Sequence, residues 1–361
     1  MSRTDHKREV TMTDVAARCG VSYQTVSRVI NEMPEVADAT RTRVLRVIEQ
    51  LGYRPNMTAR HLVSRRSTVL GHVSFAIGLY GPSQTMVNVE ESAKQAGYRV
   101  MFTGVVDPNI NEISRAVNEL CSHRVAGILV YLPVEIDLSV LRSLCQNIPV
   151  VAMDSDLNFK TPAVMVQQKS GSRIATEHLI NLGHRRIACI RASQAWRPGR
   201  LRYQGWLSAL KEASLIPGPC IEGDWSPLSG FQAAQTLIKN HWGEFTALVV
   251  ANDQMALGAI RAFHEAGISI PDDISVVGFD DIPESGYFLP PLTTIRQDFP
   301  RVGKLGVQCL LEEIRSGSRG TRTYTIVPNL IQRASTARPR KKSQRPVRSK
   351  NGNLNHKIST N

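Results

Sequence analysis

Residues 11–31 read TMTDVAARCGVSYQTVSRVIN, and this stretch decides the architecture of the amino-terminal part of the chain. Thr11 followed by Asp14 is typical of a helix N-cap with a carboxylate in the first turn. Gly20 is placed to end that helix, because glycine tolerates the left-handed conformation past a helix terminus. Ser22 can then cap a second helix over residues 23–31. Two short helices joined by a tight glycine turn predict a helix-turn-helix.

A third helix fits residues 38–51, with Gly52 at its end, and Pro55 then breaks the chain. Apolar residues recur at helical spacing through all three segments. They are Val15, Ala16, Cys19, Val26, Val29, Ile30, Val44, Leu45, Val47, Ile48 and Leu51. We therefore expect an all-α head over residues 1–54.

The outward face of the second helix carries polar groups that suit DNA. Its side chains are Tyr23, Gln24, Ser27 and Arg28. Gln24 can pair with an adenine edge, and Arg28 can make a bidentate contact with guanine. Ser22 and Thr25, at the helix N-terminus, suit phosphates. The alternative is a small solvated helix pair that reads no base.

Residues 53–62 read YRPNMTARHL and join the head to the rest of the chain. We interpret residues 55–66 as a short hinge helix with little apolar surface of its own. Leu62 is an apolar side chain on this otherwise polar, basic segment. It is either a packing residue or a wedge for a minor-groove base step.

Positive charge is concentrated at the two ends of the chain. Residues 1–66 hold twelve Lys/Arg and seven Asp/Glu, residues 338–361 hold eight basic and no acidic residues, and the middle is balanced. Basic ends favour contact with a polyanion, although they also serve solubility. The tail over residues 338–361 is aperiodic and polar, so we expect it to be disordered.

From about residue 67 apolar strand-like runs alternate with amphipathic helical stretches. Candidate strands are residues 69–75, 99–104, 127–131, 150–154, 163–166, 187–191, 247–251 and 275–279, and candidate helices are 89–96, 112–122, 170–182, 202–213, 230–240 and 255–266. This alternation predicts an α/β core, residues 67–337, of two doubly wound parallel-sheet subdomains. We place one subdomain at about residues 67–166 and 298–325, and the other at about residues 167–297 and 326–337.

Several classes of protein are disfavoured. The six cysteines (Cys19, Cys121, Cys145, Cys189, Cys220 and Cys309) form no C-x-x-C pair, so we interpret them as reduced thiols packed as small hydrophobes. We see no metal-ligand spacing, cofactor motif or catalytic motif, and we expect no metal, no cofactor and no enzyme. Without a signal peptide or a long apolar run, we expect a soluble, cytoplasmic protein.

Polar residues follow the ends of several predicted strands, where open α/β sheets bind ligands. Asp154, Asn252 with Asp253, and Asp280 with Asp281 occupy such places. Each has an ordinary alternative as a helix cap or turn residue. Arg202 and Trp225 add a bidentate donor and a flat apolar face, which together suit a sugar. Asp280 and Asp281 resemble a glycosidase pair only superficially, because adjacent residues at a strand end point to opposite faces.

The chain resembles the lac repressor (LacI/GalR) family of transcriptional regulators over roughly residues 10–337. The resemblance rests on VSYQTVSRV at residues 21–29, GDWS at 223–226, SGFQ at 229–232, VANDQMALGA at 250–259, DISVVGFDD at 273–281 and PPLTTIRQDF at 290–299. It implies a helix-turn-helix head, a hinge helix that folds on operator, and a core like periplasmic sugar-binding proteins.

The resemblance also implies roles for individual residues. Tyr23, Gln24 and Arg28 would read the major groove and Leu62 would pry open the minor groove, with Asn56 and Ala59 as further DNA contacts. Four residues, Asp154, Arg202, Asn252 and Asp280, would bind sugar hydroxyls. Trp225 would be the ring platform and Gln297 would lie at the cleft edge, whereas we interpret Asp253 as an ordinary helix cap.

Phe75, Tyr131 and Val166 depart from the family pattern in the part of the pocket away from these hydroxyl contacts. We count Phe75 and Tyr131 among the ligand-binding residues. A small neutral galactoside is the predicted ligand, and another sugar or aglycone is the alternative.

We predict a homodimer that binds a near-palindromic operator, represses a sugar-utilisation operon, and is released when sugar enters the cleft. The tetramer-forming C-terminal leucine heptads known in the family do not appear. Three alternatives remain: a repressor whose ligand is a co-repressor, as in purine-type relatives; a sugar-transport binding protein, which needs a secretory signal; and a sugar-processing enzyme, which needs turnover.

Overall fold

The computed structural model describes residues 10–30, 33–53, 67–134, 139–155, 160–317 and 320–340. The chain forms two units, residues 1–68 and 69–361. The predicted hinge, with Asn56, Ala59 and Leu62, and nearly all of the basic tail lie outside the described residues. The predictions for both segments therefore remain predictions.

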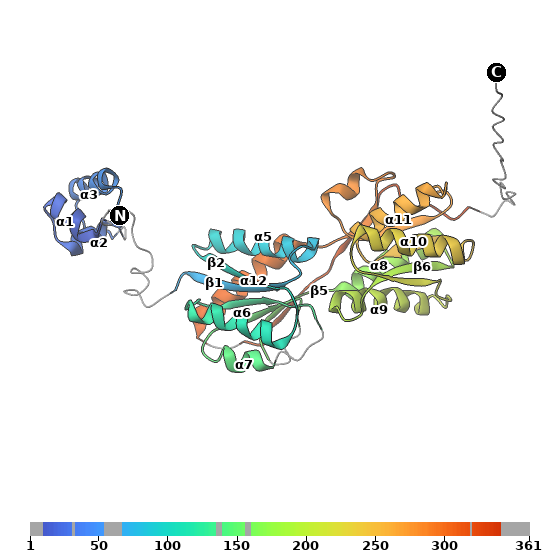
Figure 1. Cartoon of the computed structure of the whole chain (residues 1–361), viewed down its shortest axis with the longest axis horizontal. Coiled ribbons are helices and arrows are strands. Elements are labelled where there is room, and N and C mark those ends of the chain that lie inside the picture. The colour runs from blue at the N-terminus through green and yellow to red at the C-terminus, as the bar shows by residue number, and fades with distance from the viewer. Residues whose placement is uncertain are drawn as a thin grey trace, which may run out of the picture. The chain divides into compact units, whose positions relative to one another are not determined.

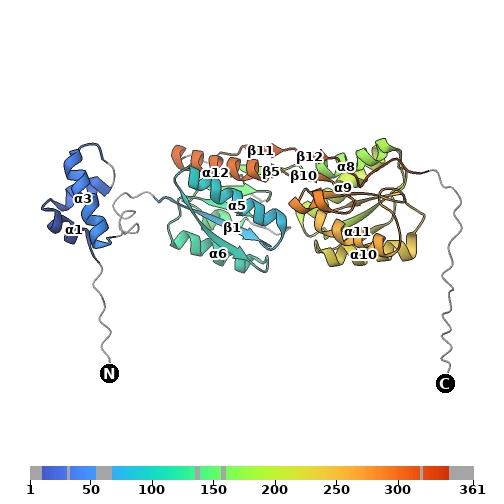
Figure 2. The same cartoon turned by 90° about the horizontal axis from the view of Figure 1, so that it is seen from above.

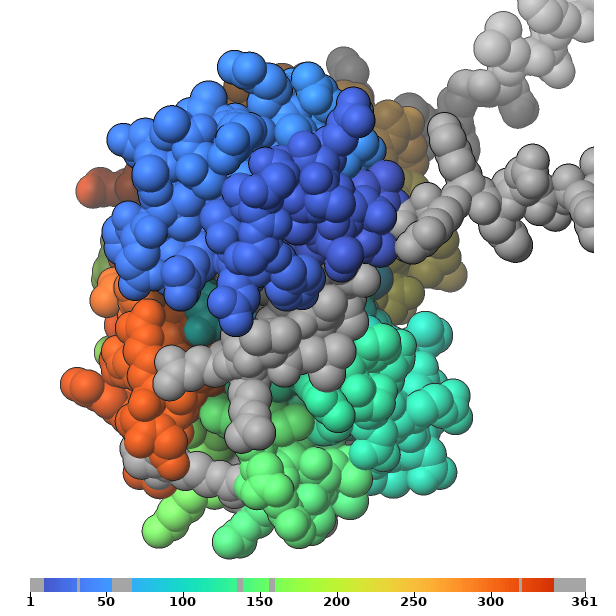
Figure 3. Space-filling view, turned by 90° about the vertical axis from the view of Figure 1, so that its left-hand side faces the viewer, coloured from blue at the N-terminus to red at the C-terminus, as the bar shows by residue number. Residues whose placement is uncertain are grey.

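Three helices form the head: α1 (Met12–Cys19), α2 (Tyr23–Ile30) and α3 (Asp38–Leu51). Thr11 and Asp14 form a reciprocal capping box, in which the Thr11 N–H donates to the Asp14 carboxylate at 2.8 Å. Gly20 ends α1 with a φ of 66°, so the predicted stop is confirmed. In the space-filling view these helices are drawn in blue (Figure 3).

The core of the head is made by the predicted apolar stripes, with one exception. Val15, Val26 and Val44 are fully or almost fully buried, and they pack together between the helices. Leu45 is 50% exposed, so its expected place in the helix stripe was wrong. It follows the buried Val44 by one residue, a step of about 100° that turns its side chain to solvent.

The larger unit contains two six-stranded sheets. The first has the order β11-β5-β4-β3-β1-β2, and all of its pairs are parallel. Its strands are β1 (Val69–Phe75), β2 (Arg99–Val105), β3 (Ile128–Tyr131), β4 (Val150–Met153), β5 (Ala163–Val166) and β11 (Thr323–Ile326). Helices α5 (Tyr80–Gln95) and α12 (Phe299–Ser316) cover one face, and α6 (Ile110–Ser122) and α7 (Val140–Leu144) cover the other (Figure 1).

The second sheet has the order β12-β10-β9-β8-β6-β7 and is parallel except for the β10–β12 pair. Its strands are β6 (Ile187–Ala192), β7 (Cys220–Gly223), β8 (Ala247–Val250), β9 (Ser275–Asp280), β10 (Thr293–Arg296) and β12 (Asn329–Ile331). Helices α8 (Gln168–Leu182) and α9 (Arg197–Glu212) lie on one face, and α10 (Pro227–His241) and α11 (Asp253–Glu265) lie on the other (Figure 2). A 3-10 turn, η1 (Pro283–Tyr287), follows β9.

The chain passes between the two lobes three times, after β5, β10 and β11. Each sheet therefore gathers strands from distant parts of the sequence, and the carboxyl ends of β3, β6, β8 and β9 border one shared cleft. The doubly wound parallel architecture predicted for this region is confirmed. The subdomain limits proposed above stay a prediction.

Gly258 on α11 lets this helix approach α10 closely. A Cβ at Gly258 would lie 1.8 Å from the Pro227 carbonyl oxygen, which is backbone and cannot swing away. We expect Gly258→Ala to lower the free energy of unfolding by about 1–3 kcal/mol, as overpacking does. Thermal or urea denaturation measures this, with the exposed Gly78→Ala as control, since a Cβ there meets nothing within 4 Å. Equal stability of both variants would contradict the close approach.

His72 on β1 is fully buried, and neither ring nitrogen has a hydrogen-bond partner among the described residues. Burial lowers its pKa from an ordinary 6.5 to about 4. The unfolded chain therefore binds the extra proton first, and stability falls as the pH drops from 6.5 towards 4. We expect His72→Leu to reduce the stability loss between pH 7.5 and pH 5 by roughly 2 kcal/mol. Denaturation at both pH values measures this; an unchanged loss would contradict it.

Candidate functional site

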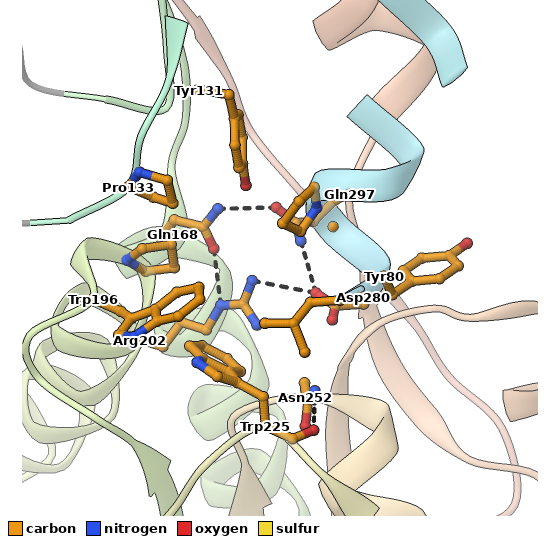
Figure 4. A pocket seen from close by; sticks show the side chains of 14 residues that line it. Tyr80, Tyr131, Pro133, Gln168, Trp196, Arg202, Trp225, Asn252, Asp280 and Gln297 are labelled. Carbon is orange, nitrogen blue, oxygen red and sulfur yellow. Dashed lines mark hydrogen bonds and ion pairs between the residues drawn. The ribbon is translucent and has the colours of Figure 1, made fainter. Parts of the chain in front are cut away.

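A cavity that is partly open to solvent lies between the two lobes, and the empty space in it and at its mouth amounts to about 440 Å³. It is lined from both lobes by residues of α5, β3, α8, α9, β9 and the loops that follow β7, β8 and β10. The lining residues are Leu79, Tyr80, Gly81, Pro82, Tyr131, Pro133, Gln168, Trp196, Pro198, Arg202, Trp225, Asn252, Asp280 and Gln297 (Figure 4). Of the eight predicted ligand residues, Asp154 and Phe75 are outside this lining, although each contacts a part of it.

The backbone is strained at this site. Asp154, Trp225 and Asp280 have φ values of 48°, 78° and 114°, a region that L-residues rarely adopt and that is unusual for a side chain as large as tryptophan. Such conformations cost about 1–3 kcal/mol each and cluster at functional sites. These backbone conformations direct side chains from the strand ends towards the cleft. Their occurrence at one site supports a functional role for these residues.

Arg202 is the centre of the polar part of the cavity. Its Nε donates to Gln168 Oε1 at 2.9 Å, and its Nη2 lies 3.2 Å from Asp280 Oδ1. Its guanidinium carbon is 3.7 Å from the centre of the Phe279 ring and 5.4 Å from that of Trp225. The arginine is thus fixed by aromatic rings as well as by hydrogen bonds (Figure 4).

Asp280 is buried and accepts from two side chains. Besides its ion pair with Arg202, its Oδ1 accepts from Gln297 Nε2 at 2.7 Å. Burial raises the pKa of Asp280, while the Arg202 charge and the Gln297 hydrogen bond act in the opposite direction. Arg202, Asp280 and Gln297, all predicted from the sequence, therefore meet in one network.

The Asp154 carboxylate already interacts with other side chains of the protein. Arg197 Nη1 lies 3.2 Å from its Oδ1, and Gln168 Nε2 donates to its Oδ2 at 2.9 Å. Burial raises the pKa of Asp154, and Arg197 opposes that rise. Both carboxylate oxygens are engaged, so a ligand hydroxyl would have to share or displace one of these partners. The predicted hydroxyl contact stays a prediction.

Aromatic rings form the apolar wall of the cavity. The centres of the Trp196 and Trp225 rings are 5.8 Å apart, and those of Phe75 and Trp196 are 4.9 Å apart. Phe75 therefore packs behind Trp196. The buried Trp225 Nε1 has no hydrogen-bond partner among the described residues. A buried donor without a partner is costly, and in a ligand cavity it is available to a bound oxygen.

Asn252 and Asp253 lie just after β8, and their roles differ from the prediction. We expected Asp253 to be the cap, but Asn252 caps α11, with its Oδ1 accepting from the Met255 N–H at 2.9 Å. Asp253 instead accepts from the Ile282 N–H at 3.0 Å and from the Thr294 hydroxyl. Asn252 also donates to the Trp225 carbonyl at 3.0 Å and thereby fixes the strained tryptophan.

Asp280 and Asp281 do not act as a carboxylate pair. Asp280 lines the cavity, whereas Asp281 forms ion pairs with Arg333 and Arg296 away from it. Burial alone would raise the pKa of Asp281, but these two arginines hold it below its usual value. Among the described residues, no group of three metal-ligating side chains is present, and no described helix is long and apolar enough to cross a membrane.

Sequence reasoning missed several lining residues. Gln168 is 2% exposed and joins Asp154, Arg202 and Gln297, while Trp196 begins the turn into α9. Gln168 follows the predicted strand at residues 163–166 by two residues, so the strand-end signal could have found it, whereas Trp196 lies four residues beyond β6 and has no such signal. The P-x-x-x-R spacing at residues 198–202 was a possible signal for an extended α9, because proline favours a first helical turn.

In the head, α2 presents the predicted DNA-reading side chains to solvent. Tyr23, Gln24 and Arg28 are exposed, while Val26 and Val29 on the opposite side are buried. Ser22 accepts from the Thr25 N–H at 3.1 Å and lies 2.9 Å from its hydroxyl, which confirms the predicted cap. Ser27 is half-buried.

Comparisons with known proteins agree with this arrangement. Residues 11–56 match the family model "Bacterial regulatory proteins, lacI family", and residues 176–336 match the periplasmic binding protein-like domain. The lactose operon repressor of Escherichia coli K12 is 35% identical over 340 residues, 94% of each chain. The repressor PurR of Haemophilus influenzae Rd is 35% identical over 333 residues, 90% of this chain and 98% of its own.

Two solved structures extend the comparison. A lac repressor dimer bound to operator and the anti-inducer ONPF has a TM-score of 0.84 and 35% identity, covering 91% of this chain and 100% of its own. The complex of the transcriptional regulator CelR with cellobiose has a TM-score of 0.67 and 28% identity, with the same coverage of both chains.

Proposed function

Because the chain belongs to the lacI family of bacterial regulatory proteins and is a DNA-binding transcriptional repressor, we propose that it represses a sugar-utilisation operon and is released by a neutral galactoside. The observation that carries the ligand class is the Arg202–Asp280–Gln297 network beside Trp225. Planar polar groups next to a flat apolar ring match the hydroxyls and the carbon face of a sugar.

The charges of the cavity support a neutral ligand. Arg202 is paired with Asp280, and Arg197 is paired with Asp154. A ligand with its own charge would meet no unpaired opposite charge in these pairs, and burying it there would cost free energy. The unpartnered Trp225 Nε1 suits a neutral oxygen acceptor instead.

We propose a homodimer that places two heads on a near-palindromic operator, since one helix-turn-helix spans a single half-site. In each head Tyr23, Gln24 and Arg28 contact base edges, with Ser27 on the same face of the helix, and Ser22 and Thr25 lie towards the DNA phosphates. The solved lac repressor dimer bound to operator supports this arrangement by homology.

A second candidate is a repressor that needs its ligand as co-repressor. The PurR relatives favour this candidate, because they match at the same 35% identity as the lactose operon repressor. In the first candidate the ligand weakens operator binding, and in the second the ligand strengthens operator binding.

Operator retention tests the proposal. Purified full-length protein is mixed with a symmetric lac-type operator and competitor DNA, and galactosides, glucosides, fructosides and purines are titrated. Release by a galactoside is the expected result. Retention that requires a purine would establish the co-repressor, and specific retention unaffected by any of these compounds would overturn the ligand assignment.

A further inference from the structure

Two cysteines lie side by side at the edge of the second sheet, far from each other in sequence. Cys189 on β6 is the direct register partner of Cys220 on β7, and their thiols share a hydrogen bond. Cys189 is 3% exposed, whereas Cys220 is half-buried on the edge strand. Cys220 is therefore the less buried member of the pair, and Cys189 is the more buried one.

A cation lies next to this pair. Arg191 follows Cys189 by two residues on β6, so both side chains project from the same face of the sheet. It forms an ion pair with Glu222 and lies 5.6 Å from the centre of the Tyr203 ring. The hydrogen bond from Cys189 and the positive charge of Arg191 lower the pKa of Cys220 despite its burial, while the pKa of Cys189 is raised.

We propose that Cys189 and Cys220 are a peroxide-sensitive thiol pair that forms a reversible disulfide. The Cys220 thiolate attacks one oxygen of hydrogen peroxide, the O–O bond breaks, and hydroxide leaves, giving a sulfenic acid. The Cys189 thiol then attacks that sulfur, the S–O bond breaks, and the departing hydroxide takes the thiol proton to form water. Two thiols and one peroxide thus give one disulfide and two waters, and a dithiol reductant reverses the change.

The backbone allows this bond. Neighbouring strands lie about 4.8 Å apart, and a disulfide spans Cα atoms about 4.4–6.8 Å apart, so paired cysteines can be bridged without strand separation. From Cys220, β7 leads within five residues to Trp225 of the cavity wall. The thiol pair is nevertheless separate from the ligand network, so its test is independent of the proposed function.

Cys121 and Cys145 supply an internal comparison. These residues, on α6 and at the end of α7, also share a thiol hydrogen bond. Burial raises the pKa of Cys121, and no cation lowers it among its identified interactions. Contact between thiols is common to both pairs, but the pKa of Cys121 is raised, whereas that of Cys220 is lowered.

The experiment treats reduced, full-length protein with increasing hydrogen peroxide, blocks the remaining thiols, and digests it with trypsin without reduction. Mass spectrometry should find residues 187–191 linked to residues 212–239, and dithiothreitol should abolish the link. We expect Cys220 to be oxidised faster than Cys121, since a lower pKa gives a larger fraction of the reactive thiolate.

Two variants complete the test. Cys189→Ser should leave a sulfenic acid on Cys220 that dimedone traps, and Cys220→Ser should leave Cys189 reduced. Urea-unfolded protein should lose the preference for this pair. Absence of the 187–191/212–239 link while other thiols oxidise, or its replacement by irreversible oxidation of Cys220, would overturn the proposal.

Discussion

Arg202→Ala is expected to lose ligand-triggered release while keeping operator binding. The alanine removes the donors to Gln168 and Asp280 and leaves the Asp280 carboxylate buried without its cation. In the proposed site Arg202 also donates to a ligand hydroxyl, and a hydrogen bond from a charged group contributes about 1.5–3 kcal/mol, so we expect ligand affinity to fall about 10–10²-fold. Calorimetric titration with the sugar identified by operator release measures this loss.

A fall in stability could imitate this result, because breaking a buried ion pair destabilises a fold by about 3–5 kcal/mol. The double variant Arg202→Met/Asp280→Leu separates the two effects, since an apolar pair of similar size tolerates burial. It should recover the melting temperature and still fail to bind sugar. Arg261→Ala is the matched control, because Arg261 is an exposed arginine paired with Glu265 on α11. Recovery of sugar binding by the double variant would refute direct recognition by Arg202.

Secondary structure could be predicted most accurately where a single local pattern of residues was sufficient. The apolar runs at residues 69–75 and 275–279 match β1 and most of β9, because strands buried on both faces need continuous apolar side chains. Asp280 could be predicted as a site residue for the same reason, because it directly follows the apolar run at residues 275–279. Short or peripheral strands gave no such signal: β7 reads CIEG and β12 has three residues.

The parts of the site that were not predicted depend on contacts between distant segments. Gln168 contacts Gln297 across 129 residues of sequence, and no local pattern marks either amide as its partner. Helix α12 was also missing from the candidate helices, although nine of its eighteen residues are buried. Its importance arises from packing against α5 and the first sheet after the chain has crossed back between the lobes. Topology, which composition and spacing do not specify, places such residues at the cleft.

The double variant Gln24→Ala/Arg28→Ala is expected to abolish selective operator binding while leaving sugar affinity unchanged. Both side chains are exposed on α2, and neither belongs to the apolar core of the head, so the helices should remain folded. A base contact by a bidentate side chain contributes about 1–3 kcal/mol of discrimination. Loss of two contacts should therefore lower the ratio of operator to non-specific affinity about 10²-fold or more.

Fluorescence anisotropy with operator and with scrambled DNA, over a range of salt concentrations, measures this ratio. Arg46→Ala is the matched control, because it removes the same charge from an exposed position on α3. It should weaken binding to both DNAs alike, since charge acts on phosphates irrespective of sequence. If the α2 variant also lost affinity equally for both DNAs, Gln24 and Arg28 would serve only as electrostatic contacts. The base-reading role would then have to be sought outside these two residues of α2.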